Sequence, residues 1–529
     1  MAYSPRTNVN AHRLLIALGL TGLVIAGPAA AAPGVRPATV VQLTPAAACV
    51  EAVGLTEAGA TLIDAKHRLW RLGPRIATRL VAGLRARGAL AAADQERTYR
   101  VAATTETPEP LQGDEWWLTH IGIDGLTPPG PGVPITVVDT GLDFAHPEFA
   151  GRPDLSALNT QEPEGIGGEH GTMVASVIGA PVNGVGIVGI YPRAIIRSWD
   201  IAKGAGRELD STEISGGILA AARAGRSVIN LSVGGTRDLA IEIAVGEAVA
   251  SGSLLVASSG NDGDRGNAIG YPAAFPHVTT VAATDRSGNV ASFSSRSPYV
   301  DLAAPGADIL VASALGKNWQ RSSGTSFSSP LVAGAAAWIW TVRPELTAGQ
   351  VAEILRRSAR DIGQSGRDPA AGFGMLNVAA ALGLAAPIRD PFEPNDDIEE
   401  VDPNGNRFVG QVQPLTTSSR RTARIAGSVD AYEDPRDVLR VWLPARTQVT
   451  ATLTASANAD LALYSTAAPS VSGRFATTGR LATVSTAGTT ERLRYRNTTR
   501  GRWAYIVVKL PPTTLDATYR LAMSARRAT

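Results

Sequence analysis

The sequence predicts an α/β protein built around a mostly parallel β-sheet with helices on both faces. Short apolar strands alternate with helical segments through the middle of the chain, and this alternation is typical of a parallel sheet covered on both sides. Before this region a helix and strands are mixed, and after it the helical pattern ends. In this 529-residue chain we therefore expect a small α+β domain at 33–112, the central domain at 113–385 and an all-β sandwich at 386–529.

Composition excludes several classes of protein. Hydrophobic residues make up 44% of the chain and charged residues 18%, which suits domains with sizeable cores. Lys plus Arg is 49 against 47 for Asp plus Glu, so the net charge of +2 argues against a nucleic-acid partner. One cysteine excludes a disulfide framework and a cysteine-rich metal site, and the six histidines contain no HExxH motif of a zinc protease.

Residues 1–32 match a secretory signal peptide. Arg6 and Arg13 precede an apolar stretch at 14–26, and small residues follow at 28–32. The alternative is a membrane anchor, which needs roughly 20 apolar residues where this stretch has about 13. We expect a secreted protein with no membrane contact after cleavage.

The 33–112 region contains one clear helix. Pro74 stands where a first helical residue is expected, apolar residues recur at every fourth position over 76–84, and Gly88 follows the end. The other elements expected here are strands within 61–72 and 97–102 and an unpacked linker at 104–110, which is rich in Thr, Pro and Glu.

The central region alternates strands with helices. A capping-box pattern at 210–213 and Gly225 mark the two ends of one helix. Functional groups in such folds gather beyond the carboxyl ends of the strands. The expected elements are strand 135–138, helix 214–224, strand 227–233, helix 241–250, strands 254–258 and 278–283, and helices 335–342 and 351–359.

The last region begins with an acidic linker at 390–397 that is interrupted by prolines. Short β-rich runs follow, separated by Ser, Thr, Gly and Pro, and this pattern predicts an all-β sandwich. The expected strands are 437–443, 448–453, 460–464 and 503–510.

Three residues carry the chemistry of nucleophilic catalysis. Asp139 ends an apolar strand, His170 opens one expected helix and Ser326 opens another. A serine hydroxyl needs a base to take its proton, a histidine is suited to this near neutral pH, and a buried carboxylate fixes the histidine tautomer. Each residue alone is more often structural, as a turn former or a helix cap, so the prediction depends on the three together.

The segments that contain these residues, 137–141, 169–175 and 323–330, resemble the subtilisin-like serine proteases (subtilases, peptidase S8 type) in the order Asp, His, Ser. The resemblance extends over about 116–384. An α/β-hydrolase has the order Ser, acid, His and a G-x-S-x-G motif, whereas Ser328 stands here at the place of the last glycine.

The resemblance implies a role for each residue. Ser326 would be the nucleophile, His170 the general base and then acid, Asp139 the orienting carboxylate, and Asn261 a side-chain donor of the oxyanion hole. The residues that it implies for substrate binding are Ser232, Val233, Gly234, Gly235, Ser258 and Gly260.

The resemblance also implies a function for the whole chain, a secreted serine endopeptidase that forms an acyl-enzyme on Ser326. The 33–112 region resembles subtilase propeptides, which act as chaperones and inhibitors and are removed by self-processing; the alternative is an inert spacer. The run 390–396 resembles the opening of a bacterial prepeptidase C-terminal domain, whose role stays open. The expected partners are protein or peptide substrates and the chain's own propeptide, with the enzyme a monomer.

Catalysis of this kind needs no cofactor, and structural Ca²⁺ is the metal that the resemblance leaves open. The candidate ligands fall into two loops. In the second loop an arginine, Arg407, stands where an EF-hand needs glycine, and we assign no ligand set. The candidates are Asp262, Asp264 and Asn267 in the first loop and Asp402, Asn404 and Asn406 in the second.

Two rival functions are less compatible with these motifs. A sedolisin-like protease uses Ser with Glu and Asp at acid pH, but His170 occupies the base position and Asn261 stands where that class has an acid. A catalytically inactive protease fold that serves as a binding module would be expected to have lost one of the catalytic residues, and none is lost here.

Overall fold

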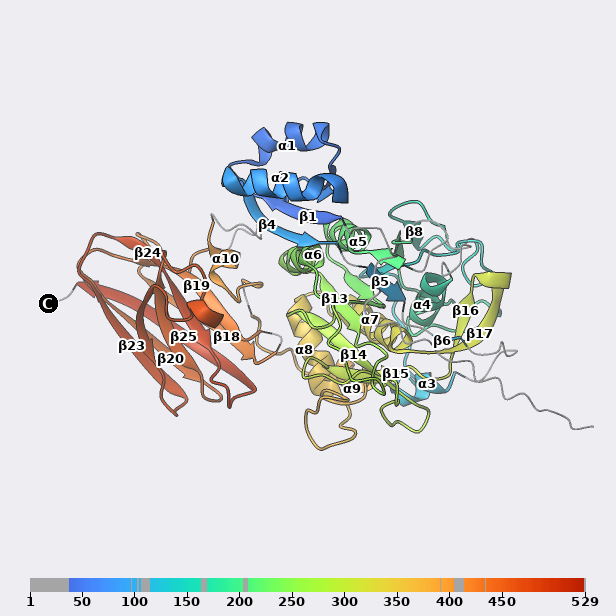
Figure 1. Ribbon diagram of the computed structural model, residues 1–529. Helices are drawn as coiled ribbons and strands as arrows, with labels where there is room; N and C mark the ends of the chain where they lie inside the picture. Colours follow the sequence, from blue (N-terminus) through green and yellow to red (C-terminus); the bar gives the residue numbers. More distant parts are fainter. Residues whose placement is uncertain are drawn as a thin grey trace, which may run out of the picture.

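Three packed units follow one another along the chain (Figure 1). The expected signal peptide at 1–32 lies outside the described residues, and so does 106–110 of the expected linker. The computed structural model describes residues 38–96, 98–101, 104–105, 115–162, 169–202, 208–390, 392–403, 413–432 and 434–527.

The central unit is built on a seven-stranded sheet in which every neighbouring pair of strands is parallel. The spatial order is β15-β14-β13-β11-β7-β9-β8. The predicted α/β fold class is therefore confirmed. The strands are β7 (Ile135–Asp139), β8 (Leu155–Ala157), β9 (Ile196–Asp200), β11 (Val228–Leu231), β13 (Leu254–Ser258), β14 (Val278–Thr284) and β15 (Leu302–Pro305).

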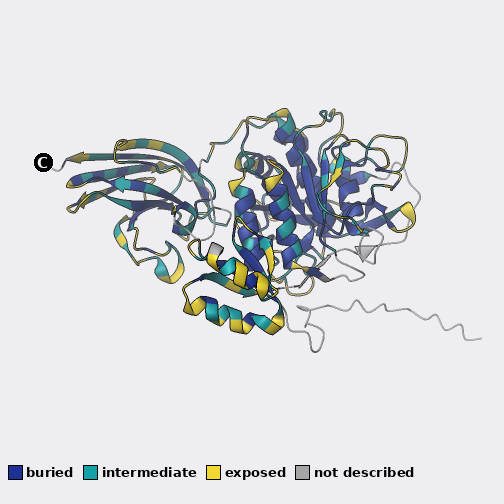
Figure 2. Cartoon of the chain, turned by 90° about the horizontal axis from the view of Figure 1, so that it is seen from above, coloured by how far each residue is buried: buried dark blue, intermediate teal, exposed yellow. Residues whose placement is uncertain are grey.

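Helices cover both faces of this sheet because successive strand residues point to opposite sides. Val137 belongs to the core under one set of helices, and Val138 belongs to the core under the other. The burial pattern follows these layers, with the deepest residues in the sheet and the facing helix sides (Figure 2). The first face holds α4 (His170–Gly179), α7 (Thr325–Val342) and α8 (Ala348–Ser358), and the second holds α5 (Ser211–Arg223) and α6 (Leu239–Ala250).

Two helix boundaries differ from the sequence prediction. α5 begins at Ser211, and the side chain of Asp210 makes no capping hydrogen bond, so the expected capping box does not form. α7 begins at Thr325 rather than at 335, because Pro330 lies inside the helix without ending it. The shorter helices of the unit are α3 (Trp116–His120) and α9 (Val378–Gly383).

The N-terminal unit is a four-stranded antiparallel sheet that lies on α5 and α6 (Figure 1). Val40 and Leu69 of this sheet pack directly on Leu239 and Ile243 of α6. The predicted helix after Pro74 is present on the opposite face. The strands, in spatial order, are β2 (Thr61–Asp64), β3 (Leu69–Leu72), β1 (Thr39–Leu43) and β4 (Leu90–Gln95), and the helices are α1 (Ala48–Glu57) and α2 (Pro74–Ala86).

The C-terminal unit consists of two four-stranded antiparallel sheets with an apolar core, which confirms the predicted all-β sandwich. A short helix, α10 (Ile398–Val401), precedes it. One sheet contains β18 (Thr422–Asp430), β25 (Asp516–Arg527), β20 (Thr447–Ala455) and β23 (Thr490–Asn497), and the other contains β19 (Arg436–Leu443), β24 (Arg502–Lys509), β21 (Asp460–Ser465) and β22 (Arg480–Val484). No helix among the described residues combines the length and the apolar character needed to cross a membrane.

Candidate active site

Asp139 and His170 form a buried pair at the carboxyl edge of the central sheet. Asp139 is the last residue of β7 and His170 is the first residue of α4. His170 Nδ1 lies 2.8 Å from Asp139 Oδ1, and the two residues are 3% and 1% exposed. The other ring nitrogen, Nε2, is buried and has no hydrogen-bond partner among the described residues. The pair therefore presents one ring nitrogen that can take a proton.

Two glycines let α4 approach the loop after β7. A Cβ atom on Gly171 would lie 2.1 Å from the backbone oxygen of Gly141. Gly141 itself has a φ of +89°, and a Cβ there would lie 2.6 Å from Asp200 Oδ2. Because side chains are excluded at both positions, His170 comes within hydrogen-bond reach of Asp139.

Ser326 lies in the first turn of α7, close to the same histidine. The ring of the next residue, Phe327, is 5.9 Å from the His170 ring between centroids. Ser326 is fully buried, and its Oγ donates to the backbone oxygen of Ser232 at 3.4 Å. Among the described contacts there is no hydrogen bond between Ser326 Oγ and His170. Such bonds are often long until a substrate is bound, so the arrangement remains compatible with proton transfer.

Pro330 contributes to the link between α7 and the neighbouring strand. A proline has no N–H, so it cannot bond to the carbonyl four residues earlier, which is that of Ser326. Ser232 Oγ donates to this carbonyl at 3.0 Å instead. Asn230 Nδ2 donates to Ser232 Oγ, also at 3.0 Å. The position of the serine turn is therefore tied to the segment after β11.

Asn261 is anchored beside the serine turn through its side-chain oxygen. Oδ1 accepts hydrogen bonds from the Thr325 backbone N–H at 3.0 Å and from Thr325 Oγ1 at 2.9 Å. The Gly260 backbone N–H donates to Thr325 Oγ1 at 3.2 Å. Because the oxygen is held on Thr325, the amide nitrogen on the opposite side is the donor group, as an oxyanion hole requires.

The expected substrate strand pairs with a segment of the N-terminal region. β12 (Val233–Gly234) lies antiparallel to β5 (Thr98–Val101), and β10 (Glu208–Asp210) pairs with the other edge of β5. β5 is therefore the middle strand of a three-stranded sheet. The register places Val233 opposite Val101 and Gly234 opposite Arg100.

A second pairing follows only a few residues later. β6 (Thr104–Thr105) pairs with the end of β17 (Asn318–Ser323), which itself pairs with β16 (Ile309–Ser313). Thr104 lies opposite Ser323, three positions before Ser326. The expectation of an unpacked linker is therefore wrong for its first two residues, because their backbone joins a sheet edge.

The remaining predicted residues border this region. Gly235 exchanges two backbone hydrogen bonds with Tyr271, both at 2.9 Å. Ser258 is the buried last residue of β13, and Gly260, with a φ of +102°, follows it toward Asn261. The residues expected to bind substrate therefore lie along two neighbouring strand ends.

Sequence reasoning missed Asp200, which lies at the end of β9 opposite Asp139. Asp200 accepts backbone hydrogen bonds from Glu162 at 2.6 Å and Ala202 at 2.8 Å. Burial raises the pKa of Asp200, and the nearby charge of Asp139 raises it further. Its position at a strand end was the available signal, but no motif marked it.

In the part of the chain that the structure describes, the acidic calcium candidates Asp262, Asp264 and Asp402 belong to no group of three or more acidic, histidine or cysteine side chains that could hold a metal ion. Asn267 Oδ1 accepts the Arg296 backbone N–H at 2.8 Å. Asn404 and Asn406 lie outside the described residues. A group that could hold a metal ion occurs elsewhere, at Asp390, Glu393, Asp434 and Asp437.

Comparisons with known proteins agree with this geometry. Residues 130–374 match the sequence profile of the Subtilase family. Subtilisin E of Bacillus subtilis (strain 168) is 36% identical over 256 residues, which are 48% of this chain and 66%, just under two thirds, of that protein. The subtilisin of Bacillus pumilus is 35% identical over 256 residues, which are 48% of this chain and 91% of that one. Fervidolysin from Fervidobacterium pennivorans, a keratinolytic enzyme related to subtilisin, shares the fold, with a TM-score of 0.58 and 18% identity over 87% of this chain and 85% of that chain.

Proposed function

Since the chain belongs to the subtilase family, we propose that it is a serine endopeptidase that hydrolyses peptide bonds in proteins through an acyl-enzyme on Ser326. The observation that carries this proposal is the buried hydrogen bond between His170 and Asp139 beside the serine turn of α7. Both rival functions are less compatible with it, because a sedolisin-like site needs no such histidine and an inactive fold needs no such pair.

In the first half of the reaction, Ser326 Oγ attacks the carbonyl carbon while its proton passes to His170 Nε2. Asp139 holds the ring by Nδ1 and stabilises the imidazolium that forms. The Asn261 amide and the Ser326 backbone N–H donate to the oxyanion. His170 then gives the proton to the leaving amine. In the second half, water attacks the acyl-enzyme by the same route.

The test is labelling with a serine-directed fluorophosphonate, followed by mapping of the modified peptide. We expect the label on Ser326 in the mature protein, no label in Ser326→Ala, and full labelling in Ser328→Ala. Ser328 is a suitable control because it lies in the same helix and its Oγ bonds to the Pro305 carbonyl at 3.2 Å. A label on another residue would remove Ser326 from this role.

We further propose that the N-terminal region, 33–112, contains a propeptide that the enzyme cuts from itself. β5 occupies the strand position beside β12 that a substrate would take, and β6 lies against the residues just before Ser326. Ala102 and Ala103 join these two strands in the sequence. The bond between them is therefore the cleavage site that the flanking registers support.

N-terminal sequencing of the processed protein tests this assignment, and we expect Ala103 as the first residue. A synthetic peptide with the sequence of Thr98–Thr105 should be cut between its two alanines by the mature enzyme. A first residue later than Ala103, with this peptide left intact, would overturn the assigned bond but not the protease activity.

The other expectations about processing and export are also proposals. We assign 1–32 to a signal peptide, 113–385 to the catalytic domain and 386–529 to a C-terminal sandwich, so that the mature enzyme is secreted. Support comes from the minor extracellular protease Epr of Bacillus subtilis (strain 168), which is 34% identical over 338 residues, or 62% of this chain and 50% of that protein. Fractionation of a producing culture, with the mature form expected in the medium, is the direct test.

A further inference from the structure

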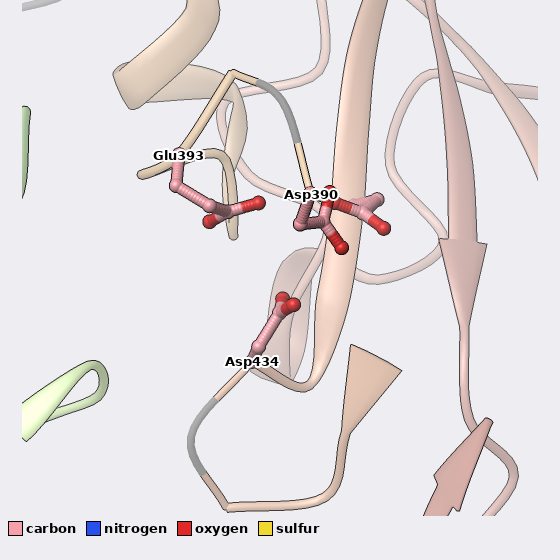
Figure 3. Close-up of side chains that lie close together, drawn as sticks. Asp390, Glu393 and Asp434 are labelled. Atoms are coloured by element: carbon pink, nitrogen blue, oxygen red, sulfur yellow. The ribbon is translucent and has the colours of Figure 1, made fainter. Parts of the chain in front are cut away.

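Four carboxylates converge where the linker after the central unit meets the sandwich. Asp390 and Glu393 belong to the linker, Asp434 lies before β19, and Asp437 is the second residue of β19. One oxygen atom from each side chain lies within 4.8 Å of those from the other three. Asp390, Glu393 and Asp434 point toward one shared space (Figure 3).

The oxygens that face this space are buried and lack hydrogen-bond partners. Asp437 is 0% exposed, and neither of its carboxylate oxygens accepts a hydrogen bond of ordinary geometry. Burial raises the pKa of Asp437 to about 6, and the Tyr519 and Asn395 side chains offset part of this rise. The other buried oxygens without a partner are Asp390 Oδ1, Glu393 Oε2 and Asp434 Oδ1.

The opposite oxygens of two of these side chains are fixed by hydrogen bonds. Asp390 Oδ2 accepts from the Ser428 backbone N–H and from Ser428 Oγ, the latter at 3.1 Å. Glu393 Oε1 accepts from Asn395 Nδ2 at 2.6 Å. Each carboxylate is thus held by one oxygen while the other is directed at its neighbours. This is the arrangement of a prepared ligand set.

Among the described residues, no lysine or arginine is paired with any of the four carboxylates. Within the described part of the chain, the cluster's ion-pair contact is with His277 of the central unit, whose Nε2 lies 3.5 Å from Glu393 Oε2 and 3.0 Å from Asp396 Oδ2. Buried carboxylates at this separation repel one another strongly unless a positive charge lies between them. A single histidine at the border does not fill this role.

We propose that Asp390, Glu393, Asp434 and Asp437 bind a Ca²⁺ ion. All four offer oxygen, which Ca²⁺ accepts in sets of about six to eight at roughly 2.3–2.6 Å, with bidentate carboxylates allowed. The two oxygens of Asp437 suit a bidentate ligand. The set contains no sulfur or ring nitrogen, which Zn²⁺ prefers, and Mg²⁺ keeps most of its water rather than entering an all-protein site.

The ion would join two parts of the chain directly, the linker and the sandwich. Two ligands come from the linker and two from the start of the sandwich, so binding fixes the linker on the sandwich. The linker also contacts the central unit through the 3.0 Å contact between Asp396 and His277. The site therefore sets how firmly the sandwich is held against the central unit, and it is independent of the protease chemistry.

The experiment uses the full chain carrying Ser326→Ala, which prevents self-digestion, after removal of metal with EDTA. Calcium chloride is titrated calorimetrically into this protein and into the same protein with Asp434→Asn or Asp516→Asn. Asp516 is the control because it is an exposed aspartate of the same unit, outside the cluster. Thermal unfolding of each protein is recorded in EDTA and in calcium.

We expect the parent and the Asp516→Asn protein to bind one more Ca²⁺ than the Asp434→Asn protein, or to bind it at least about tenfold more tightly, because ligand charge tunes affinity. In EDTA, Asp434→Asn should unfold at the same or a higher temperature than the parent, since one repelling charge is gone. In calcium the order should reverse. Equal binding and equal calcium-dependent shifts in all three proteins would overturn the site, whatever the activity of the enzyme.

Discussion

The two flanking units both meet the central unit through carboxylates, but among the described residues lysine and arginine side chains pair with them at the N-terminal junction alone. Asp64 of β2 pairs with Arg223 of α5, and Glu247 of α6 pairs with Lys66. His67 lies between the two acids, 2.7 Å from Asp64 and 2.9 Å from Glu247. At the C-terminal junction four carboxylates meet with one histidine at their border.

The difference indicates two kinds of attachment. Ion pairs between two units can be replaced by water and salt when the units separate, so the N-terminal junction is reversible in principle. A cluster that lacks its own cations is stable only with an ion bound or with protons taken up. Under the proposed function, the unit that is released and the unit that stays are therefore held by opposite arrangements of charge.

The largest effect is expected from Ser326→Ala, which should keep the N-terminal unit joined to the chain. Removing the nucleophile lowers turnover by a factor on the order of 10⁶ in subtilisin, a relative of this chain. Produced in a host without other extracellular proteases, the variant should remain full-length after the signal peptide, as seen by gel and by mass. Cleavage of the variant at the same bond would mean that another protease does the processing.

A smaller effect is expected from Asn261→Asp, which should slow processing without preventing it. The change keeps the oxygen that Thr325 binds and removes the amide donor, so kcat should fall by about 10²–10³ while KM changes little. Peptide hydrolysis at several substrate concentrations measures both constants. Activity close to that of the unchanged enzyme would show that the amide is not an oxyanion donor.

The N-terminal junction itself is tested by Glu247→Gln. Lys66 and His67 contact the charge that this change removes. The free energy that binds the cut N-terminal unit to the central unit should therefore fall by about 1.5–3 kcal/mol, and the cut unit should dissociate roughly 10–100-fold faster. The lag before full activity reports this rate. Glu242→Gln is the control, because Glu242 lies on the same helix but pairs with Arg237. High salt should shorten the lag of the parent more than that of Glu247→Gln. Equal lags in the parent and in the Glu247→Gln protein would contradict the role assigned to Glu247 at this junction.

The smallest effect concerns Glu148, a carboxylate that neither a paired cation nor the proposed metal ion balances among the described residues. Burial raises the pKa of Glu148 to about 7, although it accepts hydrogen bonds from the Ile187 N–H and the Trp319 indole. The folded chain keeps the proton up to about pH 7, whereas the unfolded chain loses it near 4.5. This group's contribution to stability is therefore complete below pH 4.5 and is lost as pH rises toward 7.

Glu148→Gln should abolish that part of the pH dependence. Relative to the parent, its free energy of unfolding should be higher at pH 8, by at most about 3 kcal/mol, and unchanged at pH 4. Urea unfolding in the Ser326→Ala background at the two pH values measures the difference. Burial raises the pKa of Glu115 to about 7 as well, and the charge of Glu148 raises it further. A residual dependence of stability on pH, from Glu115, is therefore expected. If the free energy of unfolding depended on pH in the Glu148→Gln protein as it does in the parent, the raised pKa would not belong to Glu148.

The central unit was predictable because its strands and helices differ in the spacing of their apolar residues and in length. β13 agrees with its prediction to the residue, and the three motifs place the catalytic candidates at strand and helix ends. α7 was predicted too short because Pro330 normally marks a helix start or a break. Here the helix continues, since Ser232 takes over the hydrogen bond that the proline cannot make.

Contacts between distant segments were not predictable in the same way. Asp390 and Glu393 meet Asp434 and Asp437 only after the sandwich has formed, and no spacing in the sequence links the two pairs. The strand β23 alternates more buried residues with exposed ones, three arginines and one threonine, so its hydrophobic signal was too weak to mark it. The residues of the candidate site came from motifs, whereas the pairing of β5 between β10 and β12 required the structure.

The middle position of β5 has a consequence for what the enzyme can attack. When that strand leaves, β10 and β12 become two facing strand edges with unpaired backbone groups between them. Only a chain that presents both of its own edges can fill such a slot, and a strand inside a native sheet presents neither. Under the proposed function, the slot would therefore admit an extended segment, such as a loop or a terminus, before a strand of an intact sheet.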